Sequence, residues 1–195
     1  MSRVIDVHTT FYPRIWLDYL EQKKGSLRLE RTGPTSMKLY VSNYAVSHIE
    51  RPGHYDADVR LKDLDKAGID TQIVAVEWAK RINDYFAEMT QKYKGRLYAY
   101  MTLPYQDVDA TLKEIERAHR ELKLKGIQMF SNLNGKPVSS AEFLPIYAKA
   151  EEHDLPIFMH PASPLTIEIM RAHKVSASLY GFLFDTTVAV MSLIW

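Results

Sequence analysis

Two histidines lie at the ends of apolar runs, where they could hold a divalent metal ion. His8 follows the run at residues 4–7, and His160 follows the run at residues 155–159. A neutral imidazole is a common ligand for zinc and similar ions. Strand side chains alternate between faces, so residue 10 is expected to point the same way as His8, but it is a threonine. The two histidines indicate a candidate metal site, although a lone strand-end histidine is more often a hydrogen-bonded structural residue.

The segments that must position these histidines alternate between strand and helix patterns. Apolar residues at helical spacing predict a helix between Asp107 and Gly126, and Asp185 is the expected N-cap of the last helix. β-branched and apolar runs predict strands at residues 4–7, 71–76, 97–102, 127–130 and 155–159. The other predicted helices are residues 14–24, 57–67, 82–93, 145–153, 164–174 and 186–195. This alternation predicts βαβ units and a parallel sheet.

A parallel sheet of this kind has one of two architectures, an open doubly wound sheet or a closed (β/α)₈ barrel. No Gly-rich phosphate loop follows the first strand, which argues mildly against the nucleotide-binding open sheets. Enzymes with (β/α)₈ barrels keep their chemistry at the carboxyl ends of the strands. Polar residues recur at those ends in this chain, namely His8, Glu77, Asn132 and His160.

Two further residues are candidate substrate contacts. Asn132 follows the fourth predicted strand and could bind substrate, or it could be a strand-end hydrogen-bonding residue. Arg51 lies in an insertion and could pair with a substrate carboxylate, or it could be a solvated surface residue.

Composition limits the class of protein. The 195 residues are enough for one domain, spanning residues 1–195 with a small insertion at about 26–53. Lys and Arg number 25 against 24 Asp and Glu, so neither nucleic acid nor an anionic membrane is the expected partner. There are no cysteines, which excludes thiolate metal sites. No apolar run approaches the roughly 20 residues of a membrane span, and no signal peptide opens the chain, so a cytoplasmic protein is expected.

The sequence segments around the histidines resemble those of a known family. Residues 5–13, Ile-Asp-Val-His-Thr-Thr-Phe-Tyr-Pro, are similar to the opening of the metal-dependent amidohydrolase superfamily. More narrowly, they resemble its branch that contains aminocarboxymuconate-semialdehyde decarboxylase. Further stretches resemble the same branch in the same order, at residues 55–70, 81–84, 95–104, 126–128, 143–148, 155–161 and 181–189. The resemblance covers nearly the whole chain.

This resemblance implies an α/β fold of (β/α)₈ TIM-barrel type with a divalent metal, zinc by preference, in its mouth. His8 and His160 match two of the family's metal-ligand positions, and Thr10 replaces a second histidine of the first strand. The family's acid–base histidine and a metal-binding aspartate are expected beyond residue 195, so no catalytic residue is assigned. The chain is accordingly expected to hold only about the first five βα units, as a truncated product.

The resemblance implies an enzyme that acts on a small carboxylated organic acid, either by hydrolysis or by non-oxidative decarboxylation. The alternative is a catalytically inactive barrel remnant that acts through self-association or through a partner. An incomplete barrel exposes the edge of its sheet, so a homo-oligomer is expected, and the remnant hypothesis predicts one together with the absence of bound metal.

Overall fold

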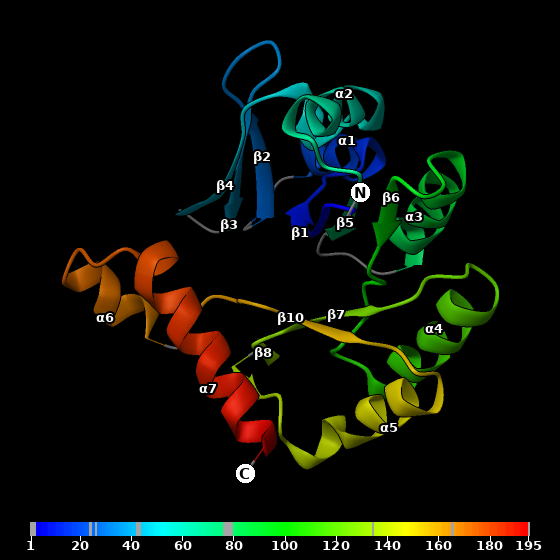
Figure 1. Cartoon of the computed structure of the whole chain (residues 1–195). Coiled ribbons are helices and arrows are strands. Elements are labelled where there is room, and N and C mark those ends of the chain that lie inside the picture. Colours follow the sequence, from blue (N-terminus) through cyan, green and yellow to red (C-terminus); the bar gives the residue numbers. More distant parts are fainter. Residues whose placement is uncertain are drawn as a thin grey trace. The chain divides into compact units, whose positions relative to one another are not determined.

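The computed structural model describes residues 3–23, 25, 27–41, 44–75, 80–133, 135–164 and 166–194. The chain divides into two compact units (Figure 1). The first comprises Met1–Glu77 and Asp84–Ala99, and the second comprises Trp78–Asn83 and Tyr100–Trp195.

The first unit is built on a parallel sheet of three strands in the order β1-β5-β6. Helices lie between these strands along the chain, which is the arrangement that βαβ units require. The strands are β1 (Ile5–Thr10), β5 (Thr71–Ala75) and β6 (Leu97–Ala99), and the helices are α1 (Arg14–Gln22), α2 (Ala57–Ala67) and α3 (Lys80–Lys92). The first residues of α3, up to Asn83, belong to the second unit. Asp56 is the N-cap of helix α2, and its carboxylate accepts hydrogen bonds from the backbone N–H groups of Asp58 and Val59.

Strand β1 is longer than the apolar pattern predicts. It does not end before His8 but continues to Thr10, because Thr9 and Thr10 pair with β5 and threonine favours strands. Between Asp6 and Thr9 the register with β5 shifts by one residue, as in a β-bulge. The shift falls in the stretch of β1 backbone that contains His8.

The long connection between α1 and α2 forms an antiparallel meander. Its strands are β2 (Leu27–Arg31), β3 (Met37–Val41) and β4 (Tyr44–Ile49), and the one-turn 3₁₀ helix η1 (Pro52–His54) follows them. Tyr12, in the β1–α1 connection, hydrogen-bonds the Ser47 hydroxyl at 2.5 Å, and its backbone N–H donates to the carbonyl of His54 at 2.8 Å. These bonds fix the meander to the loop that follows β1.

The second unit contains the parallel pair β7 (Ile127–Phe130) and β10 (Ile157–His160), which lie side by side in Figure 1. Their register pairs Phe130 with His160, so the two carboxyl ends meet at one edge. An isolated parallel bridge joins Met101 to Ile127. The other elements of this unit are α4 (Val108–Arg120), β8 (Asn132–Leu133), β9 (Lys136–Pro137), the 3₁₀ turn η2 (Ala141–Phe143), α5 (Leu144–Glu152), α6 (Ile167–Ala172), the π-helical turn η3 (Ala177–Gly181) and α7 (Phe182–Ile194).

The strand pairing distinguishes between the two architectures that the sequence allows, the doubly wound sheet and the (β/α)₈ barrel. In doubly wound sheets the first strand is internal, and in the order 3-2-1-4-5-6 the fourth strand lies beside it. Here the fourth parallel strand, β7, bridges to Met101, just after the third strand, and the fifth strand, β10, pairs with β7. Strand order therefore follows chain order within each sheet, as it does in a (β/α)₈ barrel.

Other predicted boundaries are also wrong. Helix α4 ends at Arg120 rather than at Gly126, because Lys123 takes a positive φ of 61° and the Leu124 N–H returns to the carbonyl of Ala118. Strand β6 ends at Ala99, and only Met101 pairs beyond it. Helix α7 begins at Phe182, so Asp185 lies in its first turn and is not its N-cap.

Asn83 anchors a buried polar network in the second unit. Its side chain is fully buried, and its Nδ2 donates to the carbonyl of Thr102 at 2.9 Å and to Glu114 Oε1 at 2.7 Å. The Thr102 N–H donates back to Asn83 Oδ1 at 2.9 Å. Glu114 also accepts two hydrogen bonds from the guanidinium of Arg117. Each of these buried groups would lose one partner without the Asn83 amide, and buried polar groups need partners.

Helix α7 leaves most of its apolar side chains in solvent. Leu183, Phe184 and Ile194 are 65–70% exposed, and only Ala189 is buried among the residues described for this helix. An exposed apolar surface of this extent is typical of a contact surface. None of the helices in the described part of the chain has the length and apolar content that crossing a membrane requires.

Candidate functional site

His160 closes strand β10, the position where the sequence predicts a metal ligand. Its Nδ1 lies 2.9 Å from the carbonyl oxygen of Pro161. A carbonyl only accepts, so Nδ1 carries the proton in this contact and the lone pair lies on Nε2. This is the tautomer in which a metal-binding histidine is usually held. The rings of Phe130 and Phe158 meet the imidazole edge-on, with centroids at 5.9 and 6.3 Å.

The residues that follow β7 lie beside the residues that follow β10. The Ser131 N–H donates to the carbonyl of His160 at 2.9 Å, and the Ala162 N–H donates to Ser131 Oγ at 2.8 Å. Asn132 Nδ2 donates to the carbonyl of Ser163 at 3.2 Å and lies 3.4 Å from Asp185 Oδ2. The structure thus brings the predicted residues Asn132 and His160 to the same strand edge.

The other predicted residues belong to the first unit. The backbone of His8 lies in β1, and its imidazole lies outside the part of the chain that the structure describes, as does Glu77. Arg51 is exposed and precedes η1. Burial lowers the pKa of His54, and the neighbouring positive charges of Arg60 and Arg51 lower this pKa further.

Position 10, where the resemblance implies a second histidine, lies beside a cation. Arg60 Nη2 donates to Thr9 Oγ1 at 2.6 Å and to the carbonyl of Thr10 at 3.1 Å. Burial lowers the pKa of Arg60, while the carboxylate of Asp6 opposes this shift. Threonine is not among the usual ligands of zinc. The described residues therefore fit a metal ion at His160 and do not fit one at Thr10.

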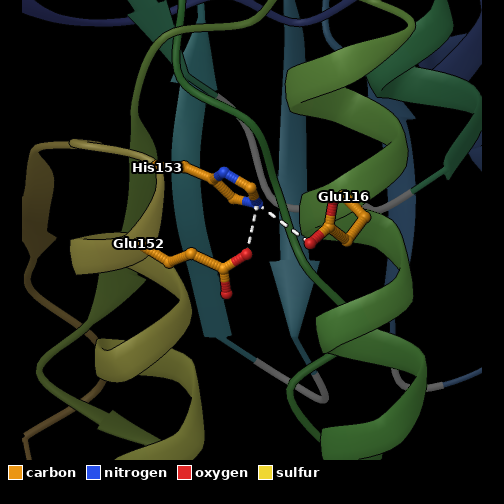
Figure 2. Close-up of side chains that lie close together, drawn as sticks. All are labelled: Glu116, Glu152 and His153. Atoms are coloured by element: carbon orange, nitrogen blue, oxygen red, sulfur yellow. Dashed lines mark hydrogen bonds and ion pairs between the residues drawn. The ribbon is translucent and has the colours of Figure 1, made fainter.

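A second group of metal-ligand residue types lies on helices α4 and α5. Glu116 of α4, Glu152 of α5 and His153 at the end of α5 place ligand-type atoms within 4.8 Å of one another (Figure 2). His153 Nε2 lies 2.9 Å from Glu116 Oε1 and 3.9 Å from Glu152 Oε1. Sequence analysis missed this group, because the residues of α4 and α5 that form it are more than 30 positions apart.

Cations of the chain already occupy this group. Lys149 Nζ lies 2.9 Å from Glu116 and 2.6 Å from Glu152, so its ammonium bridges the two carboxylates. Arg120 pairs with the other oxygen of Glu116 at 2.6 Å. The charges balance without an added ion, and we interpret the group as an ion-pair network that joins α4 to α5.

The network predicts a pH dependence of stability. Hydrogen bonds from Lys149 and His153 lower the pKa of Glu116 from 4.5 to about 2. Because the folded-state pKa is the lower one, this contribution to stability is complete above about pH 4.5 and disappears as the pH falls toward 2. The thermal midpoint of Glu116→Gln should therefore lie below that of the unmodified chain at pH 6, and the gap should close near pH 2. A gap that stays constant over this range would contradict the ion-pair interpretation, and Glu121→Gln, at the exposed end of the same helix, is the control.

Comparison with known sequences gives one family match and several relatives. The sequence model of the amidohydrolase family, described as "Amidohydrolase", matches residues 5–186. The 2-amino-3-carboxymuconate-6-semialdehyde decarboxylase of Dictyostelium discoideum is 26% identical over 211 residues, which cover 100% of this chain and 58% of the relative. A γ-resorcylate decarboxylase of Rhodococcus jostii is 30% identical over 163 residues, covering 70% of this chain and 50% of the relative.

Solved structures share the fold. A 5-carboxyvanillate decarboxylase of Novosphingobium aromaticivorans, crystallised with manganese and 4-hydroxy-3-methoxy-5-nitrobenzoic acid, has a TM-score of 0.77 and 27% identity over 98% of this chain and 60% of its own. The apo IDCase of Metarhizium anisopliae has a TM-score of 0.82 at 22% identity, covering 98% and 60%. These similarities confirm the predicted α/β fold of (β/α)₈ TIM-barrel type. The chain spans about three fifths of the length of these relatives.

Proposed function

The chain belongs to the amidohydrolase family, and from this premise we propose that it acts in the metal-dependent, non-oxidative decarboxylation of a small carboxylated acid. Hydrolysis and decarboxylation are both expected from the sequence. The names of the relatives favour decarboxylation, because the matched proteins from Dictyostelium, Rhodococcus and Novosphingobium are all decarboxylases. A carboxylated phenol is the proposed substrate class, since two of these relatives are named for such acids.

The single observation in the chain that carries this proposal is the position of His160. It ends a parallel strand, and its Nδ1 is held by the Pro161 carbonyl in the tautomer suited to metal binding at Nε2. We propose His8 and His160 as ligands of one divalent ion, which would polarise a substrate oxygen when bound. Zinc is the ion expected from the sequence, and the manganese in the Novosphingobium structure makes Mn²⁺ the second candidate.

The reaction breaks the carbon–carbon bond that joins the carboxylate group to the rest of the substrate. Carbon dioxide leaves, the bonding electron pair stays on the carbon, and a proton replaces the lost group. The proposed part of this chain is to hold and orient the acid. Arg51 would pair with a carboxylate through its guanidinium, and Asn132 would hydrogen-bond a substrate oxygen. No group of this chain is assigned to proton transfer.

The proposal includes the cellular setting that the sequence analysis predicts, a cytoplasmic homo-oligomer with a small-molecule ligand. The nearly balanced charge of the chain supports a small-molecule partner over nucleic acid or a membrane. Light scattering of the purified protein measures the oligomeric state directly.

A second candidate function is a catalytically inactive protein that acts through self-association. The exposed apolar side chains of α7 favour it, because surfaces of this kind are commonly covered by a partner. Strand β1 also lies at the edge of its described sheet. This candidate predicts an oligomer and no bound metal.

The test is a decarboxylation assay on the purified chain with Mn²⁺ or Zn²⁺ and a panel of hydroxybenzoates that carry carboxyl groups. We expect release of carbon dioxide by the unmodified chain, and at least a hundredfold less by His160→Ala, because a metal ligand is lost. Equal rates for the two proteins, or no turnover with any member of the panel, would contradict the proposal.

A further inference from the structure

We propose that Asp185, on the first turn of helix α7, is a positioning residue for the strand-end segment that carries His160. The inference deepens the proposed function and rests on it where metal binding is concerned. Its structural basis is a chain of hydrogen bonds from α7 through Ser131 to the residues that follow His160.

Ser131 is the junction of this chain of contacts. It follows β7 directly and is only 4% exposed. Its hydroxyl donates to Asp185 Oδ2, and the hydroxyl oxygen, Ser131 Oγ, accepts a hydrogen bond from the Ala162 N–H at 2.8 Å. Its backbone N–H donates to the carbonyl of His160 at 2.9 Å. One small residue therefore connects β7, the segment after β10 and helix α7.

The carboxylate of Asp185 determines which way the Ser131 hydroxyl points. A hydroxyl has one proton to donate and lone pairs with which to accept. An ionised carboxylate can only accept, so the Ser131 hydroxyl donates its hydrogen bond to Asp185 and leaves a lone pair of Oγ facing the Ala162 N–H. Asn132 Nδ2 approaches the same carboxylate oxygen at 3.4 Å, which adds a second donor from the loop after β7.

Two of these bonds hold the backbone on both sides of Pro161. The His160 carbonyl is bound by the Ser131 N–H, and the Ala162 N–H is bound by Ser131 Oγ. The Pro161 carbonyl between them is the acceptor for His160 Nδ1 at 2.9 Å. The orientation of the imidazole thus depends on the segment that Ser131 and Asp185 hold in place.

The experiment compares Asp185→Ala, Asp185→Asn and Ser131→Ala in the full chain. Asp109→Ala is the matched control, because Asp109 also lies in the first turn of a helix, α4, and its loss has the same effect on a helix dipole. The first readout is the affinity for Mn²⁺ by isothermal titration. The second is the tautomer of His160 from nitrogen-15 NMR of histidine side chains in the metal-free protein, assigned by its loss in His160→Gln.

We expect Asp185→Ala to weaken Mn²⁺ binding about tenfold, the lower end of the effect of groups that orient a metal ligand. Asp185→Asn should lie between Asp185→Ala and the unmodified chain, since its amide oxygen still accepts a hydrogen bond. The double variant with Ser131→Ala should bind Mn²⁺ no more weakly than the weaker of the two single variants, because Asp185 acts through the hydroxyl of Ser131. In the metal-free protein, Asp185→Ala should shift the His160 signals away from the form protonated at Nδ1, and Asp109→Ala should not.

The outcomes separate this inference from the proposed function. If the unmodified chain binds no Mn²⁺, the proposed function fails, and the NMR readout alone decides the role of Asp185. Unchanged His160 signals in Asp185→Ala would overturn the positioning role, whether or not metal binds. A loss of Mn²⁺ affinity that is equal in Asp185→Ala and Asp109→Ala would also overturn it, because a general loss of helix stability would then explain both.

Discussion

Replacing Thr10 by histidine is expected to raise the affinity of the chain for Zn²⁺ or Mn²⁺ by about 100-fold. Groups that only orient a ligand change metal affinity 10- to 100-fold, so a new direct ligand should reach at least the upper part of this range. The resemblance to the amidohydrolases implies a histidine at this position, and histidine is a usual zinc ligand where threonine is not. Isothermal titration of Thr10→His and of the unmodified chain gives the two dissociation constants.

Thr9→His is the control for this prediction. It places the same side chain one residue earlier in β1, and it removes the Thr9 hydroxyl that accepts a hydrogen bond from Arg60. The register shift near His8 leaves residues 9 and 10 in regular pairing with β5, so their side chains point to opposite faces. Only Thr10→His should gain affinity. Equal dissociation constants for Thr10→His and the unmodified chain would show that position 10 does not face the metal.

Asn83→Leu is expected to lower the free energy of unfolding by about 4 kcal/mol, which is among the larger effects of single substitutions. Leucine resembles asparagine in size but removes the amide that serves three hydrogen-bonding groups. The N–H and the carbonyl of Thr102 and the carboxylate of Glu114 would lose a partner while buried, and each such loss costs about 1–3 kcal/mol. Urea denaturation measures the change.

Gln91→Leu controls for this substitution, because Gln91 is an exposed amide on the same helix, α3. It should change the free energy of unfolding by no more than about 0.5 kcal/mol, as surface substitutions usually do. If Asn83→Leu changed stability as little as Gln91→Leu, the network around Asn83 would not contribute to the stability of the second unit.

Local patterns were sufficient to predict most of the fold. The five parallel strands and the helices between them appear in the sequence as apolar runs and helical periodicity, because burial on a sheet or against a helix face selects those patterns. Prediction failed where local and long-range bonds compete. Asp185 has the residue type of an N-cap, yet the structure places it inside α7, where it accepts a hydrogen bond from the hydroxyl of Ser131, 54 residues away.

The candidate site was predictable only in part. His160 could be found because it is a metal-ligand residue type directly after an apolar run, and the structure places it at the end of β10. The group of Ser131, Ala162 and Asp185 around it could not be found, since common residue types from distant segments carry no local signal. For the same reason, the sequence does not predict the pairing of Glu116 with His153, which are 37 residues apart.

The central claim is that this chain binds a divalent metal through His8 and His160, and the metal content of the purified protein tests it most directly. Elemental analysis of protein prepared without chelator should find about one divalent ion per chain, and His160→Ala should retain almost none. A metal-free chain, or equal metal content in the two proteins, would contradict the claim and would favour the self-associating, inactive protein.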